Sequence, residues 1–301
     1  MIIEAASPLA PIVTVVIPTR DRRELLIRAI RSVFEQTISN IEVIVVDDAS
    51  AGDLGLEEAG LADRLIVIRN PVALGVQRSR LIGATMARGR FVALLDSDDW
   101  WDVKKLEKQL AVAASYQAAF LSSRVTVAKG SLRKAAPWRP INNGERVEDF
   151  LYVQRGLLQA STALADRNTM ISLLDQTVAF KVHTDTVLFL EAQKRGLEIV
   201  QLAEPLAFFD DNPRADRMSY DPQRVVASIN WFNDVSGEWS AEARKGFVLM
   251  DMVSRYVNSG QRGKALQCLF RSWHPKLALG LYVRQIAYIL FNGSPTRFLR
   301  R

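Results

Sequence analysis

One apolar strand that ends in a cluster of acids constrains the fold of this chain more than any other feature. Residues 91–95 (FVALL) are uniformly apolar, and Asp96, Asp98 and Asp99 follow within the next four positions. A strand that is apolar on both faces is typical of the centre of a parallel sheet covered by helices on both sides. Ligands bind at the carboxyl ends of such strands, so we expect these acids to line a binding site.

A divalent metal ion is the simplest partner for this cluster. Neighbouring carboxylates repel one another, and a hard cation with oxygen ligands removes the repulsion. The alternative is that Asp98 or Asp99 only caps the helix that we expect to begin near Asp102. The chain has one cysteine and two histidines, which excludes an internal disulfide and argues against cysteine-rich or multi-histidine metal sites. A metal here should therefore be bound by oxygen.

Length and charge narrow the class of protein. The 301 residues suit one large domain, or one domain with an appendage. The net charge of +6 is moderate, and the basic residues are scattered, which argues against nucleic-acid binding. Residues 1–11 do not resemble a signal peptide, and no uncharged apolar run reaches the roughly 18 residues of a spanning helix. We expect a cytoplasmic protein, free or at the inner face of the cytoplasmic membrane.

The first 128 residues alternate between strand and helix patterns. A βαβα series of this kind predicts an α/β fold with a mostly parallel sheet and right-handed crossovers. The long segment 129–144 is predicted to be a loop, and loops of that length are often functional. The expected strands are 13–17, 41–46, 64–68, 91–95 and 120–127, and the expected helices are 21–36, a short one ending at 62, 75–87 and 103–116.

The pattern changes after the loop. Gly196 ends an amphipathic helix predicted for 184–195, as a C-terminal glycine commonly does. The region beyond 221 reads as a helical appendage. Further predicted elements are a helix at 147–155, a short apolar piece at 161–165, strands at 198–202 and 206–209, and helices at 224–233, 241–259, 262–273 and 276–290.

Two acidic strand ends are expected to flank one crevice. Asp47 and Asp48 follow strand 41–46, and the acids described above follow strand 91–95. The first strand ends in Pro-Thr-Arg-Asp at 18–21, and neither the dinucleotide fingerprint nor the P-loop motif occurs. A nucleotide bound in this crevice would be held by carboxylates, a metal and basic side chains, without a glycine cradle.

These residues carry a resemblance to a known family. The first half resembles family 2 glycosyltransferases with the GT-A fold, of the type that assembles bacterial exopolysaccharides and surface polysaccharides. The matching pieces keep their order over about a hundred residues, which makes chance agreement less plausible than for one short motif. They are 15–20 (VVIPTR), 35–37 (EQT), 42–50 (EVIVVDDAS), 70–75, Arg80, 84–89 and 94–99 (LLDSDD).

The resemblance implies an activity and a division of the chain. It implies an inverting, metal-dependent, non-processive transferase that moves one sugar, with a UDP-hexose favoured, from a nucleotide diphosphate to a saccharide or lipid-linked saccharide. The implied metal is Mg²⁺ or Mn²⁺. Residues 1–128 would form the nucleotide-sugar-binding half, 129–220 the acceptor-binding half and 221–301 the helical appendage.

The resemblance also implies roles for individual residues. Arg20, Asp48 and Arg80 each have a plainer alternative: a solvated side chain, a turn residue and an exposed helical face, respectively. Asp99 would be a second metal ligand or a helix cap. The implied donor-site residues are Pro18, Thr19 and Arg20 beside the nucleotide, Asp48 at the base, Arg80 near the nucleotide or its phosphates, Asp96 at the ribose or the metal, Ser97 in the nucleotide site, and Asp98 on the metal.

Sugar transfer also needs a base for the acceptor hydroxyl. An in-line attack requires this base on the opposite side of the sugar from the metal, so another part of the chain should supply it. Asp185 is favoured because it opens a predicted helix, where the dipole stabilises an ionised carboxylate. Relatives often carry an acid where Thr184 stands, so the match is partial, and an ordinary first-turn Asp is the alternative. The other acids considered are Asp166, Asp175 and Glu191.

The C-terminal region leaves two interpretations open. No Gln-x-x-Arg-Trp segment occurs, which argues against a processive synthase. Residues 277–291 are almost entirely apolar and are flanked by basic residues. Such a helix would suit an anionic membrane surface, or it could be an ordinary packed or dimer-forming helix.

Two rival functions remain at this level. One is a catalytically silent module that keeps the nucleotide-sugar-binding fold, and Asp185 is the residue that distinguishes it. The other is a sugar nucleotidyltransferase, which would call for a glycine-rich basic loop after the first strand. Residues 18–23 supply basic side chains but no glycine.

Overall fold

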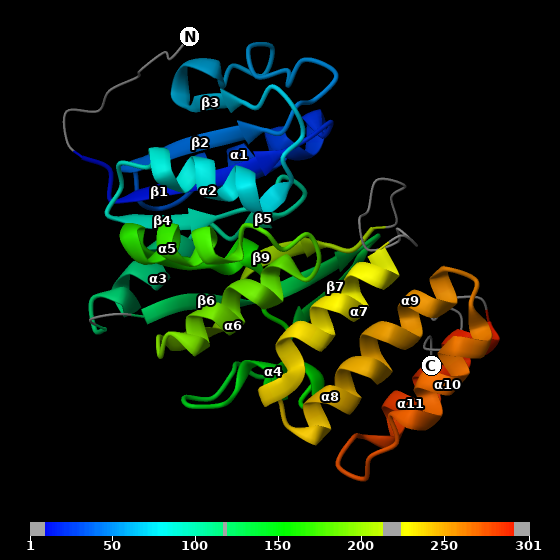
Figure 1. The fold of residues 1–301 in the computed structure, drawn as a ribbon. Helices are drawn as coiled ribbons and strands as arrows, with labels where there is room; N and C mark the ends of the chain where they lie inside the picture. The colour runs from blue at the N-terminus through cyan, green and yellow to red at the C-terminus, as the bar shows by residue number, and fades with distance from the viewer. Residues whose placement is uncertain (1–9, 117–118, 213–223, 292–301) are drawn as a thin grey trace. The chain divides into compact units, whose positions relative to one another are not determined.

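The computed structural model describes residues 10–116, 119–212 and 224–291, which form two compact units (Figure 1). The sheet unit comprises residues 1–144 and 157–212, and the helical unit comprises 145–156 and 213–301. Strand β6 runs through the division expected at residue 128, so the two predicted halves share one sheet. Segment 145–156, expected in the acceptor half, belongs to the helical unit.

The described part of the sheet unit contains one nine-stranded sheet (Figure 1). Its order is β3-β2-β1-β4-β8-β6-β9-β5, with β7 paired to β6. The bounds are β1 Val13–Thr19, β2 Ile41–Asp47, β3 Ile66–Arg69, β4 Phe91–Leu94, β5 Trp100–Trp101, β6 Ala119–Lys129, β7 Leu132–Ala136, β8 Leu164–Asp166 and β9 Glu198–Asp210.

Strand β4 lies in the middle of this sheet, as its apolar sequence predicts. It pairs in parallel with β1 and antiparallel with β8, while β1, β2 and β3 are parallel neighbours. Residues 92–95 have no exposed surface. Strands β6 and β9 of the same sheet are also parallel to each other. The sheet is therefore mixed but mostly parallel, and the predicted α/β class is confirmed.

Helices cover the central strands on both faces, because successive side chains of a strand point to opposite sides. Val15 and Ile17 of β1 belong to the same core as Leu26 and Ile30 of α1. On the other face α2 packs on β1 and β2, α5 packs on α2, and α6 packs on α5 (Figure 1). The bounds are α1 Arg23–Phe34, α2 Val76–Met86, α3 Lys105–Ala113, α5 Arg167–Thr177 and α6 Thr184–Lys194.

Several local predictions were wrong. The predicted loop 129–144 contains β7, which forms a hairpin with β6 through Gly130 at φ +56°. The short helix before residue 62 is a turn followed by the 3₁₀ helix Ala62–Arg64. The two strands predicted within 198–209 are one strand, and the apolar piece at 161 contains the 3₁₀ helix Ala160–Thr162 before β8.

Helix α5 was missed. Asp166 caps it by accepting a hydrogen bond from Asn168 N.

The helical unit is built around two clusters of side chains. Helix α4 and the helices from α7 to α8 contribute an aromatic cluster in which Tyr152, Trp239 and Phe247 contact one another. An aliphatic cluster is formed by side chains of the π-helical turn and of helices α9, α10 and α11. The bounds are α4 Val147–Tyr152, α7 Arg224–Val235, α8 Ala241–Phe247, the π-helical turn Val248–Met252, α9 Val253–Asn258, α10 Arg262–Arg271 and α11 Leu279–Leu290.

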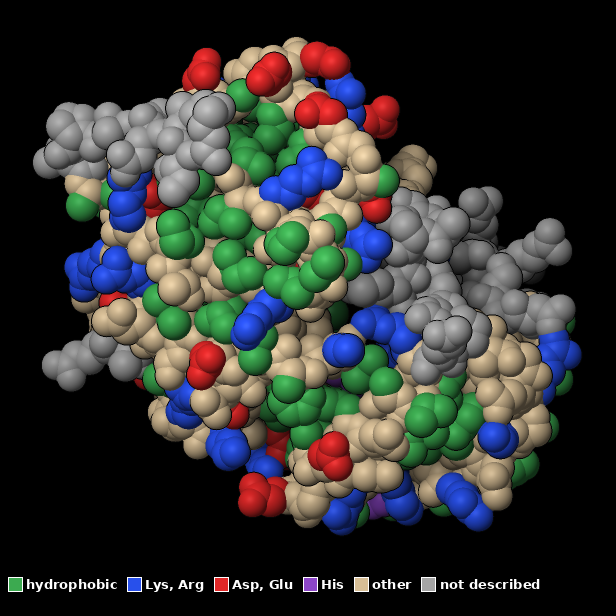
Figure 2. Space-filling view, turned by 45° about the horizontal axis from the view of Figure 1, so that its top comes forward, with side chains coloured by type: hydrophobic (Ala, Val, Ile, Leu, Met, Phe, Trp, Pro, Cys, Tyr) green, Lys and Arg blue, Asp and Glu red, His purple; other side chains and the backbone are tan. Residues whose placement is uncertain are grey.

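Two further observations concern the surface and the helices. Basic side chains are spread over the visible face instead of forming one stripe (Figure 2). Among the described residues, no helix combines the length and the apolar character that crossing a membrane requires.

Candidate functional site

The carboxyl ends of β1, β2 and β4 meet at one edge of the sheet. The register pairs Thr19 with Asp47 across β1 and β2, and Val16 with Leu94 across β1 and β4. The residues that follow these strands are therefore close to one another, although they are separated by many positions in sequence. This edge holds every donor-site residue that the sequence predicted, apart from Arg80, which α2 supplies.

Asp48 orders the segment that leads into α2. Its Oδ1 accepts hydrogen bonds from Leu74 N at 2.7 Å and Asn70 Nδ2 at 2.9 Å, and its Oδ2 accepts one from Gly75 N at 2.8 Å. Burial raises the pKa of Asp48, but these hydrogen bonds outweigh burial, so its pKa lies below the ordinary 3.8. Asp48 is ionised at neutral pH, and the Ser79 side chain adds a further hydrogen bond to its carboxylate.

Its neighbour Asp47 closes the turn that follows β2. Oδ1 of Asp47 accepts hydrogen bonds from both the backbone N and the hydroxyl of Ser50, at 2.9 and 2.5 Å. Ala49 within this turn has φ +61°. The turn role that the sequence left open for Asp48 therefore belongs to Asp47.

Arg80 joins two acids that are far apart in sequence. Its Nη2 donates a 2.7 Å hydrogen bond to Asp96 Oδ1, and Nη1 and Nη2 lie 3.3 Å from Asp185 Oδ1. Nη1 also donates to Gln77. Only 1% of Arg80 is exposed, so the alternative of a solvated helical face was wrong. Burial lowers the pKa of Arg80, but the two carboxylates raise it further, so the guanidinium stays charged.

Asp185 lies in the first turn of α6, as predicted. The helix begins after His183, at φ +53°, and Gly196, at φ +70°, follows its end. Burial raises the pKa of Asp185; the charge of Arg80 opposes this shift, the charge of Asp96 adds to it, and the net pKa lies above 3.8. A carboxylate with a raised pKa and 31% of its side chain exposed is suited to accept a proton from a ligand.

The acid cluster has the composition of a hard-metal site. Oxygen atoms of Asp96, Asp98 and Asp99 all lie within 4.8 Å of one another. Carboxylate oxygens are the donors that Mg²⁺ prefers in proteins, so the residues present fit the predicted ion. Asp96 and Asp98 retain 27% and 17% of their side-chain exposure, whereas Asp99 is buried. Asp96 and Asp98 are therefore better placed than Asp99 to reach a ligand.

Asp99 holds the acid cluster in place. Its Oδ2 accepts a 2.5 Å hydrogen bond from the Ser161 hydroxyl, and its Oδ1 accepts one from Asp210 N at 3.1 Å. Burial raises the pKa of Asp99 well above 3.8, and the charges of Asp98 and Asp96 add to the shift. Asp99 does not cap α3, whose N-cap is Lys104.

Two arginines of the region around α1 also contact the cluster. Arg22 Nη1 lies 3.1 Å from Asp98 Oδ2. Arg28 Nη2 donates to the carbonyl of Asp98 at 2.5 Å and to Asp210 Oδ2 at 2.9 Å. The guanidinium of Arg28 lies 4.1 Å from the ring centre of Trp100. The segment that follows β4 and carries the acid cluster is thus held by contacts with α1 and with the end of β9.

Sequence reasoning missed Ser161, Arg28 and Asp210. Ser161 accepts from Asp96 N at 3.2 Å as well as donating to Asp99, so one hydroxyl orients two acids. Asp210 follows the predicted strand 206–209, and the strand-end rule that singled out Asp48 could have found it. No local signal marks Ser161, because its importance depends on the fold.

The remaining predicted residues differ in their environment. Pro18 and Thr19 are buried in β1, and Thr19 Oγ1 has no hydrogen-bond partner among the described residues. Ser97 is also buried. The side chain of Arg20 is more than half exposed, and its Nε lies 3.6 Å from Oδ2 of Asp21.

Comparison with known proteins identifies relatives of the chain. Residues 14–172, more than half of the chain, match the model of the family described as "Glycosyl transferase family 2". The "Amylovoran biosynthesis glycosyltransferase AmsB" of Erwinia amylovora is 28% identical over 205 residues, which cover 64% of this chain and 68% of AmsB.

A second relative matches a shorter part. The "UDP-Glc:alpha-D-GlcNAc-diphosphoundecaprenol beta-1,3-glucosyltransferase WfgD" of Escherichia coli is 32% identical over 111 residues. The match covers 36% of this chain and 44% of WfgD, less than half of that protein.

Among solved structures, S. aureus TarS (residues 1–349) in complex with UDP-GlcNAc has a similar fold. The TM-score is 0.58, the sequence identity is 17%, and the alignment covers 93% of this chain and 88% of the TarS chain. At this identity the likeness bears on the fold alone.

Proposed function

The chain belongs to glycosyl transferase family 2 and is a glycosyltransferase with a GT-A-like fold, and we propose that it is inverting, metal-dependent and non-processive. One observation carries this proposal: Arg80 brings the acid cluster after β4 together with Asp185 at the start of α6. Inverting transfer needs a leaving-group site and a base within reach of one sugar. The acid cluster would supply the first and Asp185 the second.

A UDP-hexose is the donor that we propose, and a saccharide on a lipid carrier is the acceptor. The name of WfgD specifies UDP-Glc and a diphosphoundecaprenol-linked sugar, and TarS was solved with UDP-GlcNAc. A lipid carrier would bring the reaction to the cytoplasmic face of the membrane, in the assembly of a bacterial surface polysaccharide.

The proposed roles divide between binding and proton transfer. Asp96 and Asp98 would hold Mg²⁺ or Mn²⁺, which as a Lewis acid stabilises the charge that develops on the departing diphosphate. Asp185 accepts the proton of the acceptor hydroxyl as its oxygen attacks the anomeric carbon. The bond from that carbon to the phosphate oxygen breaks, and the nucleoside diphosphate leaves with the electron pair.

Other residues position these groups. Arg80 fixes Asp185 relative to Asp96, and its charge limits how far the pKa of Asp185 rises. Asp48, held ionised by its hydrogen bonds, would accept a hydrogen bond from a donor group on the nucleobase. Pro18, Thr19, Arg20 and Ser97 would line the nucleotide site.

A screen of nucleotide sugars tests the proposal. Purified protein is incubated with each UDP-hexose, with and without Mg²⁺ or Mn²⁺, and donor binding and hydrolysis are measured. We expect metal-dependent turnover of at least one donor, its loss in Asp98→Ala, and its retention in Asp63→Ala, which removes an exposed acid. Failure of every nucleotide sugar to bind with any divalent metal would refute the transferase. Retained anomeric configuration in the product would refute inversion.

A further inference from the structure

The helical unit exposes an unusual amount of apolar surface on its last two helices. On α11, Leu279, Val283, Ile286 and Leu290 occur at intervals of three or four residues and are all exposed. They form one stripe along the helix. The opposite side of α11 is already used, since Leu281, Tyr282 and Ile289 are buried in the aliphatic cluster of the same unit.

A second stripe lies on α10, the neighbour of α11 in this unit (Figure 1). Leu266 and Phe270 of α10, and Trp273 just past its end, follow the same spacing, and Phe270 and Trp273 are 76% and 57% exposed. We call the two stripes together the α10–α11 surface. Single exposed apolar residues are ordinary, but a group of large ones on two adjacent helices marks an interaction site.

The α10–α11 surface is rigid enough to act as a preformed site. The hydroxyl of Tyr282 donates to Ser272 O at 2.8 Å and accepts from His274 N at 2.9 Å, which fixes the connection between the helices. The ring of Trp273 lies 5.0 Å from that of Tyr282. The apolar side chains are therefore held outward by ordered helices.

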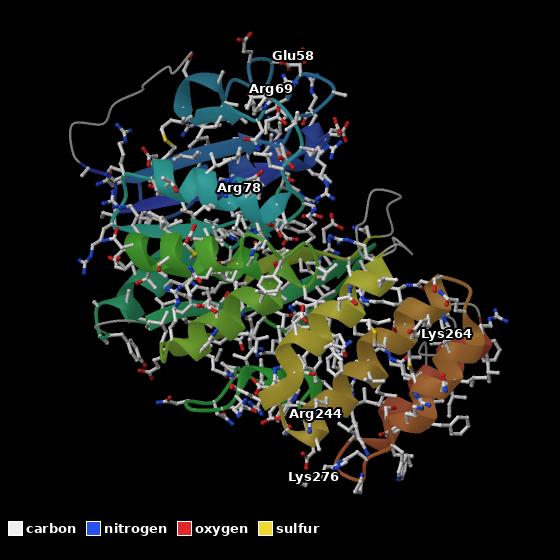
Figure 3. All side chains as sticks on the ribbon, viewed as in Figure 1. Glu58, Arg69, Arg78, Arg244, Lys264 and Lys276 are labelled. Atoms are coloured by element: carbon white, nitrogen blue, oxygen red, sulfur yellow. The ribbon has the colours of Figure 1, made fainter. Side chains whose placement is uncertain are left out.

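The charge of this region identifies its partner. From Met252 to Arg301 the chain contains no Asp or Glu, although it contains 33 in total, and it contains nine Lys or Arg. Lys264, Arg271 and Arg284 are exposed on the two helices, while Lys276, between them, is paired with Glu242 of α8 at 2.7 Å. Figure 3 shows Lys264 on α10 and Lys276 on the connection between α10 and α11. A protein partner would require matching acids, whereas an anionic lipid surface accepts any arrangement of basic residues.

We propose that the α10–α11 surface binds the surface of an anionic lipid bilayer. The apolar stripes enter the boundary between headgroups and acyl chains, and the basic residues contact lipid phosphates. The helices lie on the membrane and do not cross it. This inference does not depend on the proposed sugar transfer, because binding to vesicles needs neither donor nor acceptor.

Sedimentation with vesicles tests the role of charge. The full chain is mixed with vesicles of pure phosphatidylcholine, or of equal parts phosphatidylcholine and phosphatidylglycerol. We expect binding to the anionic vesicles alone, weakening with salt. Removal of three charges in Lys264→Gln/Arg271→Gln/Arg284→Gln should weaken it about a hundredfold, at about fivefold per charge.

A matched control removes the same charge from the sheet unit. Arg31, Arg78 and Arg133 are exposed there, and changing all three to Gln should leave vesicle binding within about twofold of the native value. Equal weakening by both triple variants would overturn the proposal, because it would mean that net charge alone drives adsorption.

Tryptophan fluorescence tests insertion. Trp273 and Trp138 are both exposed, at 57% and 67%, but only Trp273 lies on the α10–α11 surface. With brominated lipids in the anionic vesicles, quenching should disappear in Trp273→Phe and persist in Trp138→Phe. Quenching that survives Trp273→Phe, or a stable dimer by analytical ultracentrifugation without vesicle binding, would overturn the proposal.

Discussion

Nη2 of Arg80 donates a 2.7 Å hydrogen bond to Oδ1 of Asp96, and Arg80 is almost fully buried. The same guanidinium contacts Asp185, so one side chain of α2 joins β4 to α6. The position of Asp185 relative to the acid cluster therefore depends on Arg80.

Arg80→Gln should destabilise the protein. It leaves Asp96 and Asp185 close together without their shared cation, and removing one partner of a buried ion pair is costly. Because both carboxylates are partly exposed, we expect a loss of about 2–3 kcal/mol in the free energy of unfolding, measured with urea. Arg78→Gln, at an exposed position of the same helix, should change it by less than about 0.5 kcal/mol. Similar values for both variants would contradict this account of Arg80.

Asp185→Asn should separate donor binding from transfer. The amide keeps the size of the side chain but cannot take the acceptor proton, so we expect the transfer rate to fall about 10²–10⁴-fold while the donor Kd changes little. Single-turnover transfer and donor titration measure the two quantities. Asp175→Asn, an exposed change on α5, is the control. Normal transfer by Asp185→Asn would remove this residue from the mechanism.

Ser161→Ala should lower the affinity of the enzyme for its metal ion without abolishing activity. The variant removes the hydroxyl that orients Asp99 and accepts from Asp96 N. Loss of such an outer hydrogen bond typically costs about 10–100-fold in metal affinity, so the Mn²⁺ concentration for half-maximal activity should rise by that factor. Ser172→Ala on α5 should leave it unchanged. An unchanged metal titration for Ser161→Ala would show that Asp99 is held without it.

Lys105 should make stability depend on pH in the alkaline range. It is buried, hydrogen-bonds the neutral amide of Gln109, and lies over Trp101. Burial lowers its pKa well below 10.5, so between the folded pKa and 10.5 the unfolded chain binds the extra proton. The free energy of unfolding should therefore rise with pH in that window, by up to about 1.4 kcal/mol per pH unit.

Lys105→Met checks this linkage, because methionine cannot titrate. Urea unfolding at several alkaline pH values should give a flatter profile for Lys105→Met than for the native chain. Lys104→Met, at an exposed neighbouring position, should keep the native slope. Parallel profiles for all three proteins would mean that Lys105 remains protonated in the fold.

Gly83→Ala should be destabilising for steric reasons. A Cβ at Gly83 would lie 2.4 Å from Val16 Cγ1 and 3.1 Å from Val46 Cγ2, so α2 would have to move away from β1 and β2. Overpacking of this kind typically costs about 1–3 kcal/mol in the free energy of unfolding. A Cβ at Gly52 would meet no described atom within 4 Å, so Gly52→Ala should be nearly neutral by thermal and urea unfolding. Equal stability of the two variants would contradict the close packing of α2.

Much of the fold could be predicted because its signals are local. The apolar runs of β1, β2 and β4, the acids that follow them, and the first turn and final glycine of α6 are each legible within a few residues. Strand β7 and helix α5 escaped because their patterns are weak. All described residues of β7 are at least partly exposed, so no alternation of apolar residues marks it.

The candidate site divides in the same way. Asp48, Asp98 and Asp185 could be singled out from position alone, since each follows a strand or opens a helix. The burial of Arg80 could not, because it depends on the distant segments that bring Asp96 and Asp185 to α2. Asp99 is held by Asp210, which is 111 positions away, and by Ser161, which is 62 positions away.

Local sequence was thus sufficient to indicate the α/β class, the acidic strand ends and the family resemblance. The partners of those acids, the burial of Arg80 and the exposure of the α10–α11 surface came from the folded chain. The physical reason is that periodicity and strand ends are properties of neighbouring residues. The environment of a charged side chain is set instead by segments that only folding brings to it.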